Sequence, residues 1–133
     1  MKRRDLLLAL ALTAAPVALH AAESGDKKKK AGGASYIPID TLTGATTKPG
    51  GRRGVLTVEC GLDVRDGGLR SRTHASLPIL RASYVQTVIT YAAGLPPGAP
   101  PNADFLAMSL QRETDQILGR PGARLLLGAI LVN

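Results

Sequence analysis

One ten-residue stretch, VLTVECGLDV at 55–64, constrains the fold more than any other part of this 133-residue chain. Every second side chain in it is apolar, and the residues between are mostly polar or small. The apolar members are Leu56, Val58, Cys60, Leu62 and Val64. Because side chains alternate between the two faces of a β-strand, this pattern predicts a strand with one face buried. Cys60 is the sole cysteine, and its place in the apolar row predicts a buried, unreactive thiol.

The preceding segment, YIPIDTLTGATT at 36–47, also has the properties of a strand. Ile37 and Ile39 alternate with their neighbours, and Pro38 stands between them. Proline has no backbone N–H to donate to an adjacent strand, so it is confined to the edges of sheets. We therefore predict an edge strand or an extended lead-in to the domain.

A turn is predicted after the alternating strand, at Asp66-Gly67-Gly68. Glycine accepts the positive φ angles that tight hairpin turns require. Residues 69–74 would then return as a second strand with one strongly polar side.

Two later segments change from the period of a strand to that of a helix. Residues 76–94 begin with Ser76 as an N-cap and carry Pro78 in the first turn. The apolar stripe expected on this helix is Leu77, Leu80, Tyr84, Val85, Val88, Ile89 and Tyr91. After a proline-rich connector, Asn102 is a suitable N-cap for a second helix over 103–119. Its expected buried stripe is Phe105, Leu106, Leu110, Ile117 and Leu118.

The last predicted element lies in RLLLGAILVN, where eight residues, 125–132, have no polar side chain. Such a run is typical of a strand buried on both faces at the centre of a sheet. The order of elements predicts an α+β domain over 36–133, with a small mixed sheet and two helices packed on one of its faces.

The N-terminus has the layout of an export signal. A basic stretch ending in Arg3 and Arg4 precedes an apolar run of 14 residues at 6–19. As a helix this run spans about 21 Å, less than the ~30 Å hydrocarbon core of a bilayer. The layout favours a cleaved signal peptide over 1–21 and a periplasmic location, with an uncleaved membrane anchor as the alternative. Arg3 and Arg4 fit twin-arginine (Tat) export and fit the general export route equally well.

Residues 22–35 have the composition of a flexible linker, since they are charged and contain glycine without an apolar period. Its basic block is Lys27, Lys28, Lys29 and Lys30. Two roles fit this block: a solubilising tether, or adhesion to anionic lipid head groups that salt would weaken. The formal net charge is +7, but aromatic residues for base stacking are scarce, so nucleic acid is not an expected partner.

The residues with catalytic chemistry do not form a recognisable set. His20, His74 and Cys60 are too few and too scattered for a zinc site of the usual type. We expect no enzymatic activity, no cofactor, no metal and no small-molecule substrate. The charged residues proposed for contact with a partner in the folded domain are Arg81, Arg120 and Arg124.

The order of motifs resembles the periplasmic domain of the flagellar basal-body-associated FliL family. The similar stretches are YIPIDTLT, RRGVLTVECGLDV, SLPILRASYVQTVI, QILG and RLLLGAILVN. This resemblance implies a stomatin-like fold without enzymatic activity, assembly into rings, and association with the stator units of the flagellar motor.

The sequence therefore leads to the hypothesis of a non-catalytic periplasmic interaction module, a short exported relative of FliL. It would associate with itself or with a protein complex at the inner membrane such as the flagellar motor, through an exposed sheet edge and the arginines. The alternative is a small secreted module, unrelated to flagella, that binds a lipid surface or a ligand.

Overall fold

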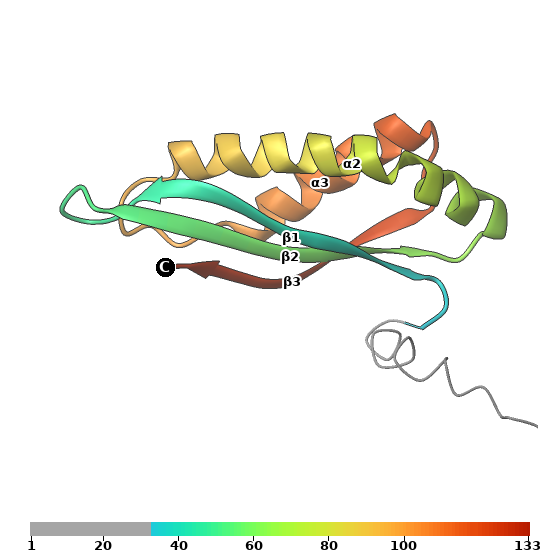
Figure 1. Ribbon diagram of the computed structural model, residues 1–133, viewed down its shortest axis with the longest axis horizontal. Helices are drawn as coiled ribbons and strands as arrows, with labels where there is room; N and C mark the ends of the chain where they lie inside the picture. The colour runs from blue at the N-terminus through green and yellow to red at the C-terminus, as the bar shows by residue number, and fades with distance from the viewer. Residues whose placement is uncertain (1–32) are drawn as a thin grey trace, which may run out of the picture.

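The computed structural model describes residues 33–133, in which two helices cover one face of a three-stranded sheet (Figure 1). The elements in chain order are β1 (Tyr36–Thr47), β2 (Arg53–Val64), α2 (Gly67–Gly94), α3 (Ala103–Leu118) and β3 (Ala123–Val132). The strand order is β1-β2-β3, and both pairs are antiparallel. The predicted signal at 1–21, with Arg3 and Arg4, and the lysine block at 27–30 lie outside the described residues.

β2 is the central strand, and one of its two faces is buried along most of its length. Its inward side chains are those that the alternation predicts: Leu56, Val58, Cys60, Leu62 and Val64. Burial of an aliphatic side chain of this size stabilises a fold by about 1.5–3 kcal/mol. This row is therefore the base on which the two helices pack.

β1 forms one edge of the sheet, as predicted. Pro38 pairs with Gly61 of β2, and three residues earlier the Ser35 carbonyl accepts a hydrogen bond from the N–H of Val64 (2.9 Å). Main-chain groups alternate in direction along a strand, so Pro38 occupies a position where an N–H would point away from β2. A proline is tolerated there because no bond to β2 is lost.

α2 begins where a hairpin and a return strand over 69–74 were predicted, so that prediction was wrong. Asp66 is the N-cap of the helix, and the N–H of Leu69 donates to its carboxylate (2.8 Å). This bond lowers the pKa of Asp66, and Arg120 lowers it further. Leu69 and Thr73 are buried at helical spacing. Aspartate followed by glycines can thus start a helix as readily as a turn.

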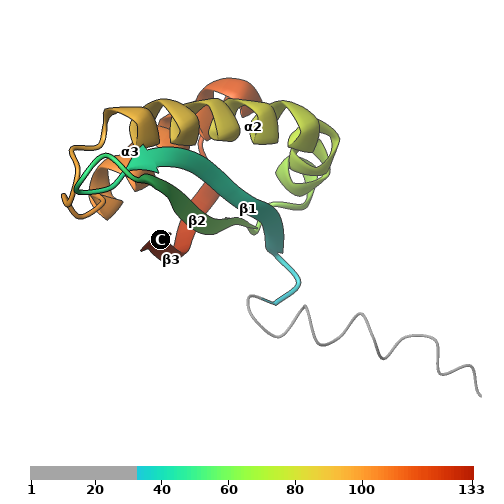
Figure 2. The same cartoon turned by 60° about the vertical axis from the view of Figure 1, so that its left-hand side comes forward.

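Pro78 lies in the interior of α2. The sequence predicts a shorter helix that begins near Ser76, with Pro78 in its first turn. An internal proline removes one main-chain hydrogen bond and disfavours the helix by about 3 kcal/mol. α2 changes direction between its first turns and the remainder (Figures 1 and 2), as expected for a proline kink. Leu69 and Leu80, buried on either side of Pro78, hold the two parts of the helix on the sheet.

α3 has the predicted caps, and Leu106, Leu110 and Leu118 of the predicted stripe are buried. The N–H of Phe105 donates to the side chain of Asn102 (3.0 Å), and Gly119 ends the helix with a φ of 80°. Phe105 is half exposed and Ile117 only partly buried, contrary to the prediction. The buried residues are Leu106, Leu110, Thr114 and Leu118.

A buried polar contact explains the place of Thr114 in that stripe. Its hydroxyl donates to the carbonyl of Leu110 (2.7 Å) and forms a second hydrogen bond with the hydroxyl of Tyr84 on α2. Burial raises the pKa of Tyr84 to about 12. The hydrogen bond between Tyr84 and Thr114 joins the two helices above the sheet. An aliphatic side chain in this buried stripe has no hydroxyl and could not form it.

β3 is the second edge strand, whereas the sequence placed residues 125–132 at the centre of the sheet. Only Ala123 and Leu125 of this strand are buried, and most of the later side chains are exposed. The α+β class with both helices on one face is confirmed, but the sheet is antiparallel throughout and not mixed.

Gly44 of β1 provides a test of how closely α2 packs on the sheet. A Cβ at this position would lie 2.8 Å from the Cβ of Ala92 and 2.9 Å from the carbonyl oxygen of Val88. We expect Gly44→Ala to lower the free energy of unfolding by about 1–3 kcal/mol, because the helix backbone must move. Gly67→Ala, where a Cβ meets nothing within 4 Å, should change it by less than about 1 kcal/mol. Equal stability of the two variants in urea would contradict this packing.

Candidate interaction surface

Among residues 33–133, hydrogen bonds to the free side of β3 occur only at the start of the strand. The side-chain amide of Gln111 on α3 donates from Nε2 to the carbonyl of Ala123 (2.8 Å) and accepts from the N–H of Leu125 (2.8 Å). Gln111 thus takes the place of a neighbouring strand for these two residues. We call the side of β3 away from β2, over residues 126–132, the β3 edge.

The hydrogen bonds at both ends of β3 show which main-chain groups face this edge. Asn133 exchanges two hydrogen bonds with Val55 of β2 (2.9 and 3.0 Å). Because the direction of main-chain groups alternates, Val132 and Ile130 direct theirs toward the β3 edge. Leu127 does the same, since it stands two residues after Leu125. Among residues 33–133 the sheet ends at β3, so this edge has no strand beside it.

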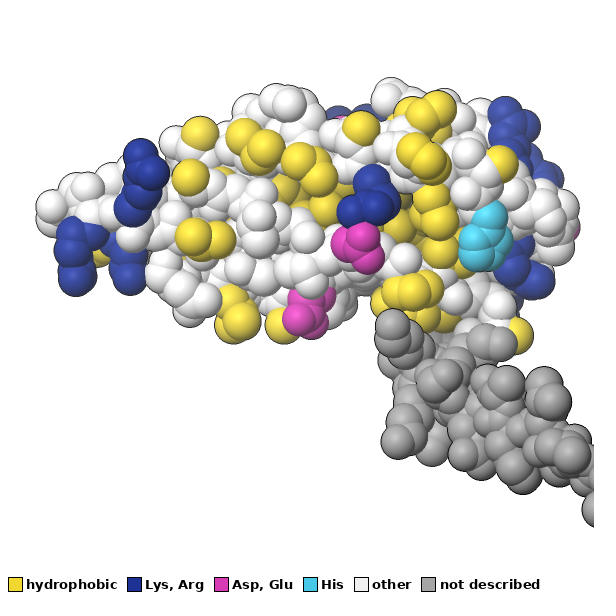
Figure 3. All heavy atoms as spheres, viewed as in Figure 1, with side chains coloured by type: hydrophobic (Ala, Val, Ile, Leu, Met, Phe, Trp, Pro, Cys, Tyr) yellow, Lys and Arg dark blue, Asp and Glu magenta, His cyan; other side chains and the backbone are white. Residues whose placement is uncertain are grey.

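The side chains of the β3 edge are apolar and partly exposed. Leu131 is 51% exposed, Val132 40% and Leu126 36%. No charged residue occurs between 125 and 132. In the space-filling view, some apolar side chains lie on the lower margin of the molecule, where β3 runs in Figure 1, and an acidic side chain lies beside them (Figure 3). An uncharged strand with exposed apolar side chains is a template for pairing with another chain.

The opposite edge, on β1, is protected in ways that the β3 edge is not. Pro38 withholds a donor on the free side, and the Asp40 carboxylate is paired with Arg81 of α2 at 2.6 Å. Both strands contain a bulge, between Ile39 and Leu42 in β1 and opposite Glu59 in β3. Proline, charge and a bulge together discourage pairing, whereas β3 has the bulge alone.

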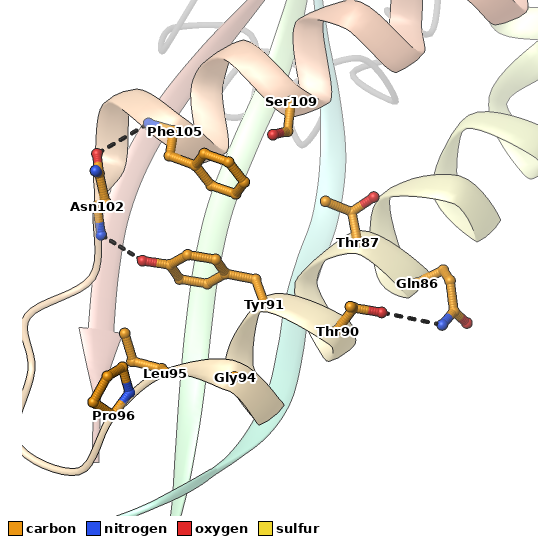
Figure 4. Close-up of a pocket in the computed structure, with 10 residues that line it drawn as sticks. All are labelled: Gln86, Thr87, Thr90, Tyr91, Gly94, Leu95, Pro96, Asn102, Phe105 and Ser109. Atoms are coloured by element: carbon orange, nitrogen blue, oxygen red, sulfur yellow. Dashed lines mark hydrogen bonds between the residues drawn. The ribbon is translucent and has the colours of Figure 1, made fainter.

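A groove between the end of α2 and the start of α3 is the second candidate site. Its volume is about 590 Å³. The rings of Tyr91 and Phe105 stack in it with centroids 5.6 Å apart, and the Tyr91 hydroxyl accepts from the N–H of Asn102 (2.7 Å) (Figure 4). Polar residues such as Gln86 and Thr90 complete the lining. Sequence reasoning missed this site because it assigned Phe105 to the core.

The three arginines predicted to contact a partner have different surroundings. Arg81 joins α2 to β1 through Asp40. Arg120 lies 2.8 Å from the carboxylate of Asp66 and joins the end of α3 to the start of α2. Arg124 is exposed near the start of β3. Two of the three therefore pair with carboxylates of the same domain, and the three lie in different places instead of forming one patch.

The residues with reactive side chains are dispersed over the described part of the chain. Burial raises the pKa of the Cys60 thiol to about 11, which keeps it protonated and unreactive at neutral pH. His74 is exposed on α2. Within residues 33–133, no three or more His, Cys, Asp and Glu side chains come together in a way that could hold a metal ion.

Neither protein-family models nor curated proteins give a match to this chain. The resemblance to FliL therefore rests on the stretches of sequence quoted above and stays a prediction. In the part of the chain that the structure describes, no helix has the length and hydropathy needed to cross a membrane.

Gln111 provides a test of how the start of β3 is held. We expect Gln111→Ala to lower the free energy of unfolding by about 1–3 kcal/mol, because the carbonyl of Ala123 and the N–H of Leu125 lose their partner. Gln116→Ala, at an exposed position on the same helix, should stay within about 0.5 kcal/mol of the parent chain. Chemical unfolding of both variants would measure the difference, and a loss as small as that of Gln116→Ala would refute the role of Gln111.

Proposed function

We propose that this chain is a non-catalytic interaction module that binds protein through the β3 edge. The observation that supports this most directly is the uncharged strand edge at 126–132, with Leu131 half exposed. Addition of a strand to such an edge supplies main-chain hydrogen bonds for affinity and side-chain contacts for specificity. Exposed apolar side chains next to unpaired main-chain groups are otherwise avoided on soluble domains.

The cellular setting of this proposal comes from the sequence. An export signal over 1–21 would deliver the domain to the periplasm, where the FliL resemblance implies a partner at the inner membrane such as the flagellar motor. Contact between the lysine block at 27–30 and anionic lipid would add affinity that falls as salt rises.

Ligand binding in the groove between α2 and α3 is the second candidate function. The stacked rings of Tyr91 and Phe105 and the volume of about 590 Å³ favour it. Sites for small molecules are commonly apolar hollows of about 300–1,000 Å³ with a few polar groups. This function would correspond to the alternative of a secreted ligand-binding module.

Site-specific photo-crosslinking in the native cells tests the choice between these functions. A benzophenone amino acid would replace Leu131 on the β3 edge, Phe105 in the groove, or, as a control, Ile79, which is 62% exposed on α2. We expect protein adducts from position 131 and few or none from position 79, because only the β3 edge is expected to bind protein. The mass of the chain in the same extract would report whether residues 1–21 have been removed.

Two outcomes would contradict the proposal. Equal yields of adduct from positions 131 and 79 would mean that the β3 edge is ordinary surface. A small-molecule adduct from position 105, without protein adducts from position 131, would favour ligand binding instead.

A further inference from the structure

We infer that the β3 edge pairs with the same edge of a second copy of this chain, antiparallel and about a two-fold axis. This inference rests on the proposed function and names its partner. The result would be one continuous six-stranded sheet with two helices from each copy on it. Four properties of the described residues support it: the pattern of main-chain groups, the charge, the hydrogen bonding on the free side of β3, and the contrast with β1.

The main-chain pattern of β3 is self-complementary. Ile130 and Val132 both present an N–H and a C=O to the β3 edge, and Leu131 between them directs its own groups to β2. A two-fold axis at Leu131 places Ile130 of one copy opposite Val132 of the other, so that donors meet acceptors in both pairs. Leu131 of each copy then meets the other across the axis.

The distribution of charge favours a second copy over an oppositely charged partner. Residues 33–133 carry ten Lys and Arg against seven Asp and Glu, a formal net charge of +3. Two copies therefore repel each other over most of their surfaces. They can approach most easily along 129–132, where β3 carries no charge and which lies beyond Gly128, the residue beside the Glu59 side chain of β2. An acidic partner would gain nothing from this uncharged strand.

Among residues 33–133, the hydrogen bonds to the free side of β3 are confined to the start of the strand. The bonds from Gln111 reach Ala123 and Leu125 and no further along the strand. In Figure 1 β3 is the lowest strand of the sheet, on the side away from α2. A second strand can therefore pair with residues 129–133 without breaking the hydrogen bonds that Gln111 of α3 makes to β3.

The contrast with β1 predicts a closed dimer and not an open chain of copies. Head-to-tail growth would require β1 to pair with β3 of the next copy. Pro38 and the ion pair between Asp40 and Arg81 oppose this. The paired segment is short, so the buried surface lies below about 1,200 Å², which is typical of weak, reversible association. We expect a dimer that dissociates on dilution in the micromolar range.

Sedimentation of the purified full chain over a concentration series would test for this dimer. We expect Leu131→Lys to weaken dimerisation at least tenfold, because it sets two like charges against each other across the axis. The matched control is Ile79→Lys, which also places a lysine at an exposed apolar position and should leave dimerisation unchanged. Unfolding curves of both variants would verify that each is folded.

A single added cysteine would test the geometry. The N–H and C=O of Leu131 face β2, so the two copies of this residue form a non-hydrogen-bonded pair with Cα atoms about 4.5 Å apart. This distance suits a disulfide, so Leu131→Cys should give a covalent dimer on mild oxidation. Met108→Cys, exposed on α3, should not, and neither should the parent chain, because Cys60 is buried.

The outcomes separate this inference from the proposed function. A chain that stays monomeric at all concentrations, or a dimer that survives Leu131→Lys and is not linked by Leu131→Cys, would overturn the inference. Photo-crosslinks from position 131 to a different protein would in that case still support the function. Absence of both the dimer and the crosslinks from position 131 would contradict both proposals.

Discussion

The inward face of β2 is the constraint on which the rest of the structure depends. A row of alternating apolar side chains with Cys60 at its middle must be kept from water, and α2 and α3 together cover it. The close approach of α2 to Gly44 and the buried bond between Tyr84 and Thr114 follow from this need. The first requires α2 to lie close against the sheet, and the second requires α2 and α3 to lie side by side on that face.

Two helices can cover the face of a three-stranded sheet without protecting both of its edges. α2 lies along β1 and is linked to it by the ion pair between Arg81 and Asp40. α3 packs on the start of β3 through the core, and Gln111 adds hydrogen bonds to Ala123 and Leu125. Within the part of the chain that the structure describes, the outer half of β3 has partly exposed apolar side chains and no strand beside it. The surface proposed for binding is therefore a direct consequence of how the core is covered.

Much of this fold could be predicted from local signals, and the failures have physical causes. Alternation identified β2, Pro38 identified an edge, and Asn102 marked the start of α3, because each is a short-range property of the chain. The start of α2 was missed because Asp66 and the glycines after it serve equally as a turn or an N-cap. The run at 125–132 was assigned to the sheet centre because an uncharged edge strand has the same composition as a buried one. Nothing in the sequence around Gln111 indicates its part in covering β3.

The reactivity of Cys60 tests the central claim most directly, because this thiol lies in the buried row of β2. Burial raises its pKa from 9.0 to about 11, so at pH 8 the folded protein holds about a hundredfold less thiolate than the unfolded chain. We predict that a bulky, water-soluble alkylating reagent reacts with the native protein at least about a hundredfold more slowly than with the chain in denaturant. Equal rates in the two states would show that this face of β2 is open to water, and the packing described here would be wrong.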